Sequence, residues 1–183
     1  MKVLVVVDMQ KDFVNGSLGS PEAQAIVPNV KKKVEEAVKN GDMIIYTRDT
    51  HFADYLNTKE GQKLPVKHCI YKTEGWRILE DVKPQASYEH AHVFNKYTFG
   101  LEELPDLIQK LLMDEGIWTD CTGIELIGLC TDICVVSNAL LLKARFYNEL
   151  DISVDATCCA GVTPESHEAA LKTMEMCQIN VTR

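Results

Sequence analysis

The chain of 183 residues has no long apolar run and no excess of basic residues. No stretch approaches the ~18 consecutive apolar residues of a membrane-spanning helix, so we expect no membrane partner. The net charge is −8, and the only basic run, residues 31–33, is typical of the solvated face of a helix. Nucleic-acid binding requires clustered Lys and Arg side chains. The composition therefore argues against a nucleic-acid partner.

An export signal and a disulfide framework are also missing. Lys2 is followed by only five apolar residues before Asp8, which is shorter than the core of a signal peptide. The seven cysteines are odd in number, include the adjacent pair Cys158 and Cys159, and contain no Cys-x-x-Cys motif. We therefore expect a cytoplasmic protein with reduced thiols and no cysteine-based structural zinc site.

What the sequence does contain is a regular alternation of apolar strand patterns and amphipathic helix patterns. Its length suits a single domain over residues 1–183. Strands are predicted at residues 2–7, 43–47, 125–129 and 150–154, with a short edge strand at 178–182. Helices are predicted at residues 28–40, 101–115, 135–147 and 163–176. This order predicts a three-layer α/β/α sandwich with a mainly parallel, doubly wound sheet.

Polar and reactive side chains follow three of the predicted strands. Asp8 ends the first, Asp49 and His51 follow the second, and residues 130–134 follow the strand at 125–129. Open α/β sheets bind ligands outside the carboxyl ends of their strands, so these segments mark one site. Residues 49–90 show few helix or strand signals, and a loop region of that length in a compact domain is more often functional.

Cys134 is the candidate nucleophile, because it stands where a strand turns into a helix. There a thiolate would face the positive end of the helix dipole, which lowers the pKa of a thiol. A buried structural cysteine remains an alternative. Asp8 and Lys96 could supply the base and the cation that a thiol nucleophile needs. Alternatively, Asp8 is a helix cap or an ion-pair partner and Lys96 is a solvated surface residue.

Three segments resemble isochorismatase-like cysteine hydrolases, in the nicotinamidase branch. They are VVVDMQKDF around Asp8, FNKYTFG around Lys96 and GLCTDICV around Cys134, and the resemblance runs from about residue 3 to residue 178. It implies an Asp–Lys–Cys triad and amide hydrolysis through a thioester, with release of ammonia. By the same analogy, backbone N–H groups of Cys130 and Cys134 would hold the oxyanion. A cis peptide bond would fall at Leu129–Cys130.

The second constellation is Asp49, His51 and His68, which can form a two-His-one-carboxylate metal site with open positions. The surrounding segments RDTH and LPVKHC resemble the metal segments of nicotinamidases. Glu60 stands where some of these enzymes add a Glu ligand, with an exposed loop carboxylate as the alternative. The resemblance implies one divalent ion, which is Zn, with Mn or Fe as alternatives, and which holds a pyridine nitrogen of the substrate.

Phe13 is predicted to line the substrate pocket, with core packing as the alternative, and Trp76 to pack under the long loop. Three further histidines are read as surface or packing residues, namely His90, His92 and His167. Nicotinamidases often have Trp-Pro before the second metal histidine, whereas this chain has Leu64-Pro65. The aromatic wall for a pyridine ring is therefore open to question.

The resulting functional hypothesis is a cysteine amidohydrolase that converts nicotinamide to nicotinate and ammonia. Alternatives are another small amide or a carbamoyl or ureido compound as substrate, and a non-catalytic binding protein that retains the fold. A true isochorismatase is disfavoured, because cleavage of a vinyl ether needs no nucleophilic cysteine. The family resemblance also implies a homo-oligomer.

Overall fold

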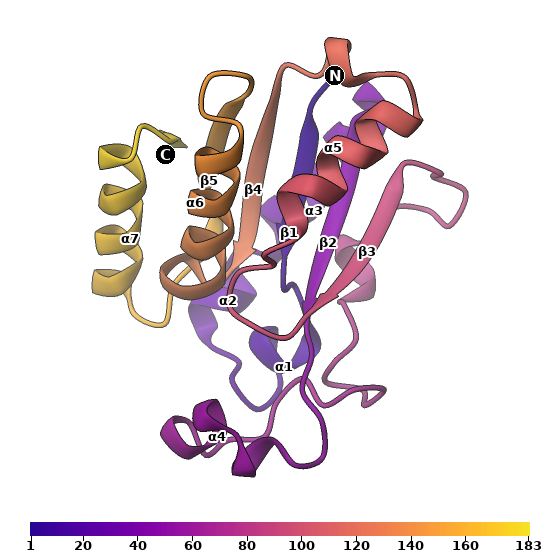
Figure 1. The fold of residues 1–183 in the computed structure, drawn as a ribbon. Coiled ribbons are helices and arrows are strands. Elements are labelled where there is room, and N and C mark those ends of the chain that lie inside the picture. The colour runs from indigo at the N-terminus through magenta and orange to yellow at the C-terminus, as the bar shows by residue number, and fades with distance from the viewer.

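The computed structural model describes residues 1–183 and shows a six-stranded sheet between two layers of helices (Figure 1). Neighbouring strands all pair in parallel, in the order β3-β2-β1-β4-β5-β6. The strands are β1 (Val3–Val7), β2 (Met43–Asp49), β3 (Ala91–Lys96), β4 (Gly123–Leu129), β5 (Asp151–Ala160) and β6 (Asn180–Thr182). The predicted three-layer α/β/α sandwich is confirmed.

Helices cover both faces of the sheet. Helix α3 and the short α2 pack on one face, and α5, α6 and α7 pack on the other (Figure 1). The α-helices are α1 (Lys11–Val14), α2 (Pro21–Ala25), α3 (Val27–Asn40), α4 (Lys59–Lys63), α5 (Leu104–Asp114), α6 (Val136–Arg145) and α7 (Pro164–Met176). The 3-10 turns are η1 (Tyr55–Asn57), η2 (Glu80–Val82) and η3 (Trp118–Asp120), and η4 (Thr131–Val135) is a π-helical turn. No helix combines the length and the apolar character that crossing a bilayer requires.

Strand β1 is uninterruptedly apolar because helices bury both of its faces. Val5 lies between Ile45 of β2 and Leu126 of β4 in the parallel ladder. Odd-numbered residues of β1 pack toward α5 and α6, and even-numbered residues pack toward α3. Burial of each such side chain contributes about 1.5–3 kcal/mol. The sheet therefore positions whatever follows these strands on a rigid base.

The chain changes its direction of winding between β1 and β4. From β1 it adds β2 and β3 on one side, and from β4 it adds β5 and β6 on the other. Ligands of doubly wound sheets bind at such a point, outside the carboxyl ends of the strands. Gly128 of β4 has φ +114°, and a Cβ there would lie 2.1 Å from the carbonyl oxygen of Val7. Only glycine permits this close approach of β4 to β1.

The structure differs from the predicted elements mainly at the polar ends of strands. Strand β3 was not predicted, because it is a half-buried edge strand with polar residues at three of its six positions. Strand β5 continues to Ala160 instead of ending at Val154, since a register shift between Leu126 and Gly128 lets pairing resume. Helix α5 begins at Leu104 rather than at Leu101.

The loop region 49–90 carries one short α-helix, α4, and two 3-10 turns, η1 and η2. It is fixed by isolated bridges, Gln10 with Ile78 and His51 with Ile70. Helix α4 lies beyond the carboxyl ends of the strands (Figure 1). The region thus covers the end of the sheet at which the predicted site residues meet.

Candidate active site

Four predicted site residues lie at the carboxyl ends of four neighbouring strands. Asp8 follows β1, Asp49 ends β2, Lys96 ends β3, and Cys134 follows β4 in turn η4. Asp49 and Lys96 are direct partners in the β2–β3 ladder. The topology alone therefore brings together side chains that are far apart in the sequence.

Lys96 is the centre of this group. Its Nζ lies 2.7 Å from Oδ2 of Asp8, 3.4 Å from Oδ1 of Asp49 and 3.4 Å from Sγ of Cys134. It also donates a hydrogen bond of 3.2 Å to the carbonyl of Thr98. The side chain is 0% exposed. A buried ammonium needs such anionic and carbonyl partners, so Lys96 is not a solvated surface lysine.

Asp8 is fixed by its backbone and by Thr47 of β2. The hydroxyl of Thr47 donates a hydrogen bond of 2.8 Å to Oδ1 of Asp8, and it accepts one of 3.3 Å from the N–H of Asp8. Asp8 has φ +47°, a left-handed conformation that Asp tolerates better than most residues. The carboxylate is thereby directed toward Lys96 and does not serve as a helix cap.

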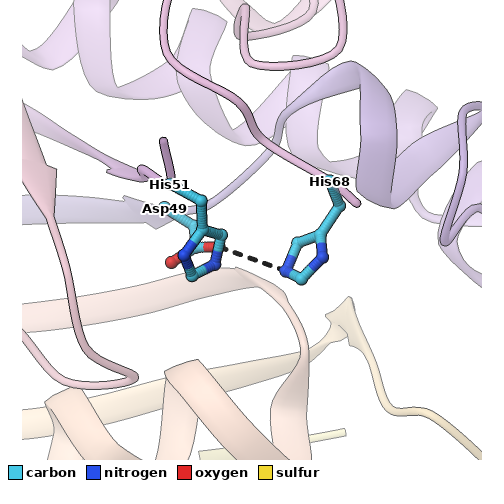
Figure 2. Close-up of side chains that lie close together, drawn as sticks. All are labelled: Asp49, His51 and His68. Atoms are coloured by element: carbon cyan, nitrogen blue, oxygen red, sulfur yellow. Dashed lines mark ion pairs between the residues drawn. The ribbon is translucent and has the colours of Figure 1, made fainter. Parts of the chain in front are cut away.

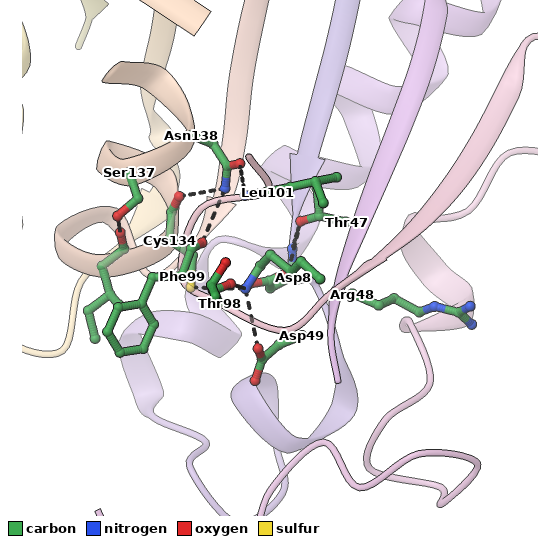
Figure 3. A network of polar contacts seen from close by, with 12 residues as sticks. Asp8, Thr47, Arg48, Asp49, Thr98, Phe99, Leu101, Cys134, Ser137 and Asn138 are labelled. Atoms are coloured by element: carbon green, nitrogen blue, oxygen red, sulfur yellow. Dashed lines mark hydrogen bonds and ion pairs between the residues drawn. The ribbon is translucent and has the colours of Figure 1, made fainter. Parts of the chain in front are cut away.

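Cys134 lies in turn η4, directly before helix α6. The peptide bond Leu129–Cys130, which opens this turn, is cis, as the family resemblance implied. Asn138 of α6 donates a hydrogen bond of 2.8 Å to the carbonyl of Cys134, and its Oδ1 accepts one of 2.9 Å from the N–H of Leu101. Asn138 thus joins the turn of Cys134 to the loop that precedes α5 (Figure 3).

The prediction that the pKa of Cys134 is lowered is wrong for this structure. Burial raises the pKa of the thiol well above its ordinary value, and the nearby ammonium of Lys96 only partly opposes this. The carboxylates of Asp8 and Asp49 raise it further. Cys134 is therefore a thiol at rest and requires a base to become a nucleophile.

The same environment sets the protonation of Asp8 and Lys96. Burial raises the pKa of the Asp8 carboxyl above its ordinary value, and the ammonium of Lys96 opposes this effect. Burial by itself lowers the pKa of Lys96, but Asp8, Cys134 and Asp49 outweigh it, so the pKa stays well above the ordinary value. Lys96 is therefore a permanent cation, and Asp8 has an increased affinity for a proton.

Asp49, His51 and His68 converge beside this group (Figure 2). Nε2 of His51 lies 2.9 Å and Nε2 of His68 lies 3.5 Å from Oδ2 of Asp49. The three ligand atoms all lie within 4.8 Å of one another. Burial raises the pKa of Asp49, but the adjacent imidazoles of His51 and His68 and the charge of Lys96 outweigh burial and lower it.

These residues fit a divalent metal ion. Nε2 of His51 is buried and makes no hydrogen bond, as expected for a nitrogen that reserves its lone pair for a metal. Nδ1 of His68 lies 2.8 Å from the carbonyl of Val66, which directs Nε2 toward the cluster. Oε1 of Glu60 lies 3.5 Å from His51 and 3.8 Å from His68, so this carboxylate stands beside the same two nitrogens.

Two positioning residues escaped the sequence analysis. Gln10 is fully buried, and its side chain bonds both backbone groups of Asp49, accepting from N–H at 2.7 Å and donating to C=O at 2.9 Å. Asp12 accepts a hydrogen bond of 2.7 Å from the N–H of Cys69, next to His68. Both belong to the segment after Asp8, but no sequence pattern shows which distant backbone they reach.

A cavity of about 360 Å³ opens above Cys134, and both Asp49 and His68 reach it. Phe13 lines it, with its ring centroid 5.5 Å from that of His68, as the sequence analysis expected. Most of the remaining wall is apolar, from Leu18, Leu64, Phe99, Leu129, Ile133 and Val162. The site thus combines a thiol, an ammonium and a metal-binding cluster around a small, largely apolar space.

The other singled-out residues lie outside this cavity. Trp76 donates a hydrogen bond of 2.9 Å to the hydroxyl of Thr50, under the long loop. His90 pairs with Glu115 at 2.9 Å. His167 lies 2.8 Å from the hydroxyl of Thr131. These side chains have packing or surface roles.

The sequence matches the isochorismatase domain family over residues 2–183. The chain belongs to this family. It is 22% identical to a nicotinamidase of Saccharomyces cerevisiae (strain ATCC 204508 / S288c), with 99% of each chain covered. The pyrazinamidase of Pyrococcus horikoshii, solved in complex with zinc, is 27% identical with a TM-score of 0.80, covering 100% of this chain and 98% of that one.

The N-carbamoylsarcosine amidase of Thermoplasma acidophilum is similar as well. It is 26% identical with a TM-score of 0.77, covering 100% of this chain and 96% of that one. Together with family membership, these relatives identify the chain as an amidohydrolase.

Proposed function

We propose that this amidohydrolase cleaves small carboxamides, nicotinamide first among them, with Cys134 as nucleophile. The observation that carries the proposal is the position of the buried Lys96 ammonium, in contact with both Asp8 and the Sγ of Cys134. A structural cysteine would not need a buried ion pair beside it. The relatives that hydrolyse nicotinamide or pyrazinamide by name support the choice of substrate.

In the proposed reaction Asp8 takes the proton of the Cys134 thiol as sulfur attacks the amide carbonyl carbon. The raised pKa of Asp8 favours this transfer, and Lys96 stabilises the thiolate as it forms. The proton then passes to the amide nitrogen, the C–N bond breaks, and ammonia leaves a thioester. Asp8 next accepts a proton from a water molecule as the water oxygen attacks the thioester carbon. The C–S bond then breaks, which releases the carboxylic acid, and the sulfur takes back the proton from Asp8.

The carbonyl oxygen becomes negative in both tetrahedral intermediates. Backbone N–H groups of Cys130 and Cys134 are proposed to bind it, since both residues line the cavity, Cys130 directly before turn η4 and Cys134 within it. Removal of one oxyanion donor costs about 2.7–4 kcal/mol in other acyl-transfer enzymes. Backbone donors are not removed by side-chain substitution, so side-chain variants at these positions do not test this role.

Asp49, His51 and His68, with Glu60 as a fourth candidate, would hold one divalent metal ion. Zinc is proposed, because the ligand set suits it and the Pyrococcus horikoshii relative was solved with zinc. Manganese and iron suit the same ligands. When bound, the metal would accept a ring nitrogen of the substrate, and Phe13 would contact the ring, so that the carboxamide faces Cys134.

The deciding experiment measures ammonia release from nicotinamide by protein with one equivalent of zinc. Cys134→Ala is expected to abolish turnover while zinc content, measured by mass spectrometry, stays at one equivalent. Cys177→Ala is the matched control, because Cys177 is exposed and distant from the cavity. Turnover by Cys134→Ala would refute the role of the thiol, and absence of turnover in the parent protein would refute nicotinamide as substrate.

A carbamoyl or ureido compound is the second candidate substrate. It is favoured by the Thermoplasma acidophilum relative and by Leu64, an aliphatic residue on the cavity wall. Ammonia release from N-carbamoyl amino acids, compared with release from nicotinamide at equal concentration, separates the two substrates. The higher kcat/KM identifies the preferred class.

A further inference from the structure

A second hollow of about 420 Å³ shares part of its wall with the catalytic cavity. Glu60, Leu64, Phe99 and Ile133 line both spaces, so the two are adjoining rather than separate. The second hollow is lined by residues of α4, of the loop after β3 and of turn η4. A substrate whose amide lies at Cys134 and that extends past the shared residues would enter this hollow.

The wall of the hollow includes aromatic faces that are open to solvent. Tyr97 is 61% exposed and Phe99 is 49% exposed. Thr98 and Phe99 belong to the loop that Lys96 and Asn138 fix next to Cys134 (Figure 3). Ligand sites are usually lined by such apolar and aromatic side chains, with a few polar groups that select the ligand.

The polar groups of this hollow are Lys59 and Lys63, four residues apart on α4. Side chains at this spacing are neighbours on a helix, and two like charges there repel each other. Neither lysine is among those that form ion pairs, which are Lys11, Lys32, Lys33, Lys83, Lys96 and Lys172. The Glu60 carboxylate lies instead near His51 and His68.

We propose that this hollow is a subsite for the part of the substrate remote from the carboxamide. It would take an apolar chain or ring that ends in a carboxylate. Leu64, Tyr97 and Phe99 would contact the apolar part, and Lys59 and Lys63 would bind the carboxylate. This inference rests on the proposed amide hydrolysis and names a substrate class for it, an amide with an anionic tail.

The test compares nicotinamides that carry at ring C5 either a 2-carboxyethyl chain or a neutral propyl chain. We expect the carboxylate compound to have a KM about tenfold lower than the neutral one in 20 mM salt, with a smaller difference in 500 mM salt, because salt screens exposed charges. Lys59→Gln/Lys63→Gln is expected to remove this preference. Lys31→Gln/Lys39→Gln, which removes two exposed lysines of α3, is the matched control and should retain it.

Equal KM values for the two compounds, or a preference that survives the Lys59→Gln/Lys63→Gln change, would overturn the subsite. Leu64→Trp provides a second variant, since a larger side chain at the boundary should lower kcat/KM for both tailed compounds relative to nicotinamide. Calorimetric binding of both compounds to Cys134→Ala measures the subsite without turnover. Selective binding without hydrolysis would support the subsite and refute the proposed reaction, so the two failures are distinguishable.

Discussion

Nζ of Lys96 lies 3.4 Å from Oδ1 of Asp49, while Oδ2 of the same carboxylate lies 2.9 Å from Nε2 of His51. One carboxylate thus contacts both the cation beside the thiol and the imidazoles of the metal-binding cluster. One oxygen of Asp49 faces the Lys96 ammonium and the other faces the histidines. Asp49 therefore links the triad residues to the metal-binding cluster, which the sequence analysis treats as separate.

Asp49→Asn should therefore impair both sets at once. The amide keeps the shape but loses the charge, so zinc affinity is expected to fall on the order of a hundredfold, as for other losses at metal sites. At saturating zinc, kcat should stay at least about tenfold below the parent value, since Lys96 loses an anionic partner. His51→Gln is the control, with a similar loss of affinity and a kcat that saturating zinc restores more fully. Equal recovery of the two variants would contradict the dual role.

Gln10→Glu tests whether Gln10 positions Asp49. The change keeps the acceptor for the N–H of Asp49 but replaces the donor to the carbonyls of Asp49 and Trp76 by an oxygen. Zinc affinity, measured by calorimetry, is expected to fall about 10- to 100-fold. Gln24→Glu, on the exposed side of α2, should leave it unchanged. A variant that unfolds more easily but binds zinc normally would limit Gln10 to a structural role.

Asn138→Ala should separate an effect on the position of Cys134, the proposed nucleophile, from an effect on stability. The change leaves the N–H of Leu101 and the carbonyl of Cys134 without partners, which costs about 1–3 kcal/mol of unfolding free energy. We expect kcat to fall on the order of tenfold in addition, because turn η4 loses its tie to the loop of Phe99. Leu142→Ala, one turn later in α6 and fully buried, should destabilise by about 2–5 kcal/mol with kcat nearly unchanged. A normal kcat for Asn138→Ala would refute the role of Asn138 in positioning Cys134.

The stability of the fold should depend on pH through Asp155, in the middle of strand β5. Lys33 lies 2.7 Å from Asp155, and although burial raises the pKa of this carboxyl, hydrogen bonds from Lys33 and Thr157 lower it below its ordinary value of 3.8. A lowered folded-state pKa contributes stability that is present above pH 4 and is lost as the pH falls through the folded-state value. Asp155→Asn should therefore cost about 1 kcal/mol at pH 7 and less at pH 3.

Urea unfolding at the two pH values measures this difference. The pKa of Lys33 is raised, so its contribution is present below 10.5 and constant across this range. Glu36→Gln, which removes the exposed pair with Lys32 at 3.9 Å, should change stability little at either pH. A cost of Asp155→Asn that is the same at pH 3 and pH 7 would show that charge pairing is not its cause.

The sequence sufficed for the fold because its strongest signals are periodic. Buried strands such as β1 and amphipathic helices such as α3 follow directly from the spacing of apolar residues. Edge strand β3 could not be predicted in this way, since the alternation of apolar and polar residues along it is weak and its pairing with β2 depends on distant residues. The extension of β5 past Val154 also depends on a register shift that no local pattern encodes.

Site residues could be predicted from the sequence where a reactive side chain comes at or directly after the end of a strand. They could not be predicted where a side chain binds the backbone of a segment far away in the sequence. Asp8, Asp49 and Cys134 could be named because the carboxyl ends of parallel strands meet at one edge. Gln10 and Asn138 could not, because their partners are backbone groups 37–39 positions away. The pKa of Cys134 was predicted in the wrong direction, because sequence shows the helix terminus but not the burial of the sulfur.

The ladder between β2 and β3 pairs Asp49 with Lys96 at the outer edge of the sheet. Side chains alternate between the two faces of a strand, so a slip of β3 by one residue would turn Lys96 away from Asp8 and Cys134. The register of the edge strand β3 therefore decides whether the thiol has the ammonium of Lys96 beside it. A molecule in which β3 is shifted by one residue would keep the rest of the fold. It is nevertheless expected to lack catalytic turnover.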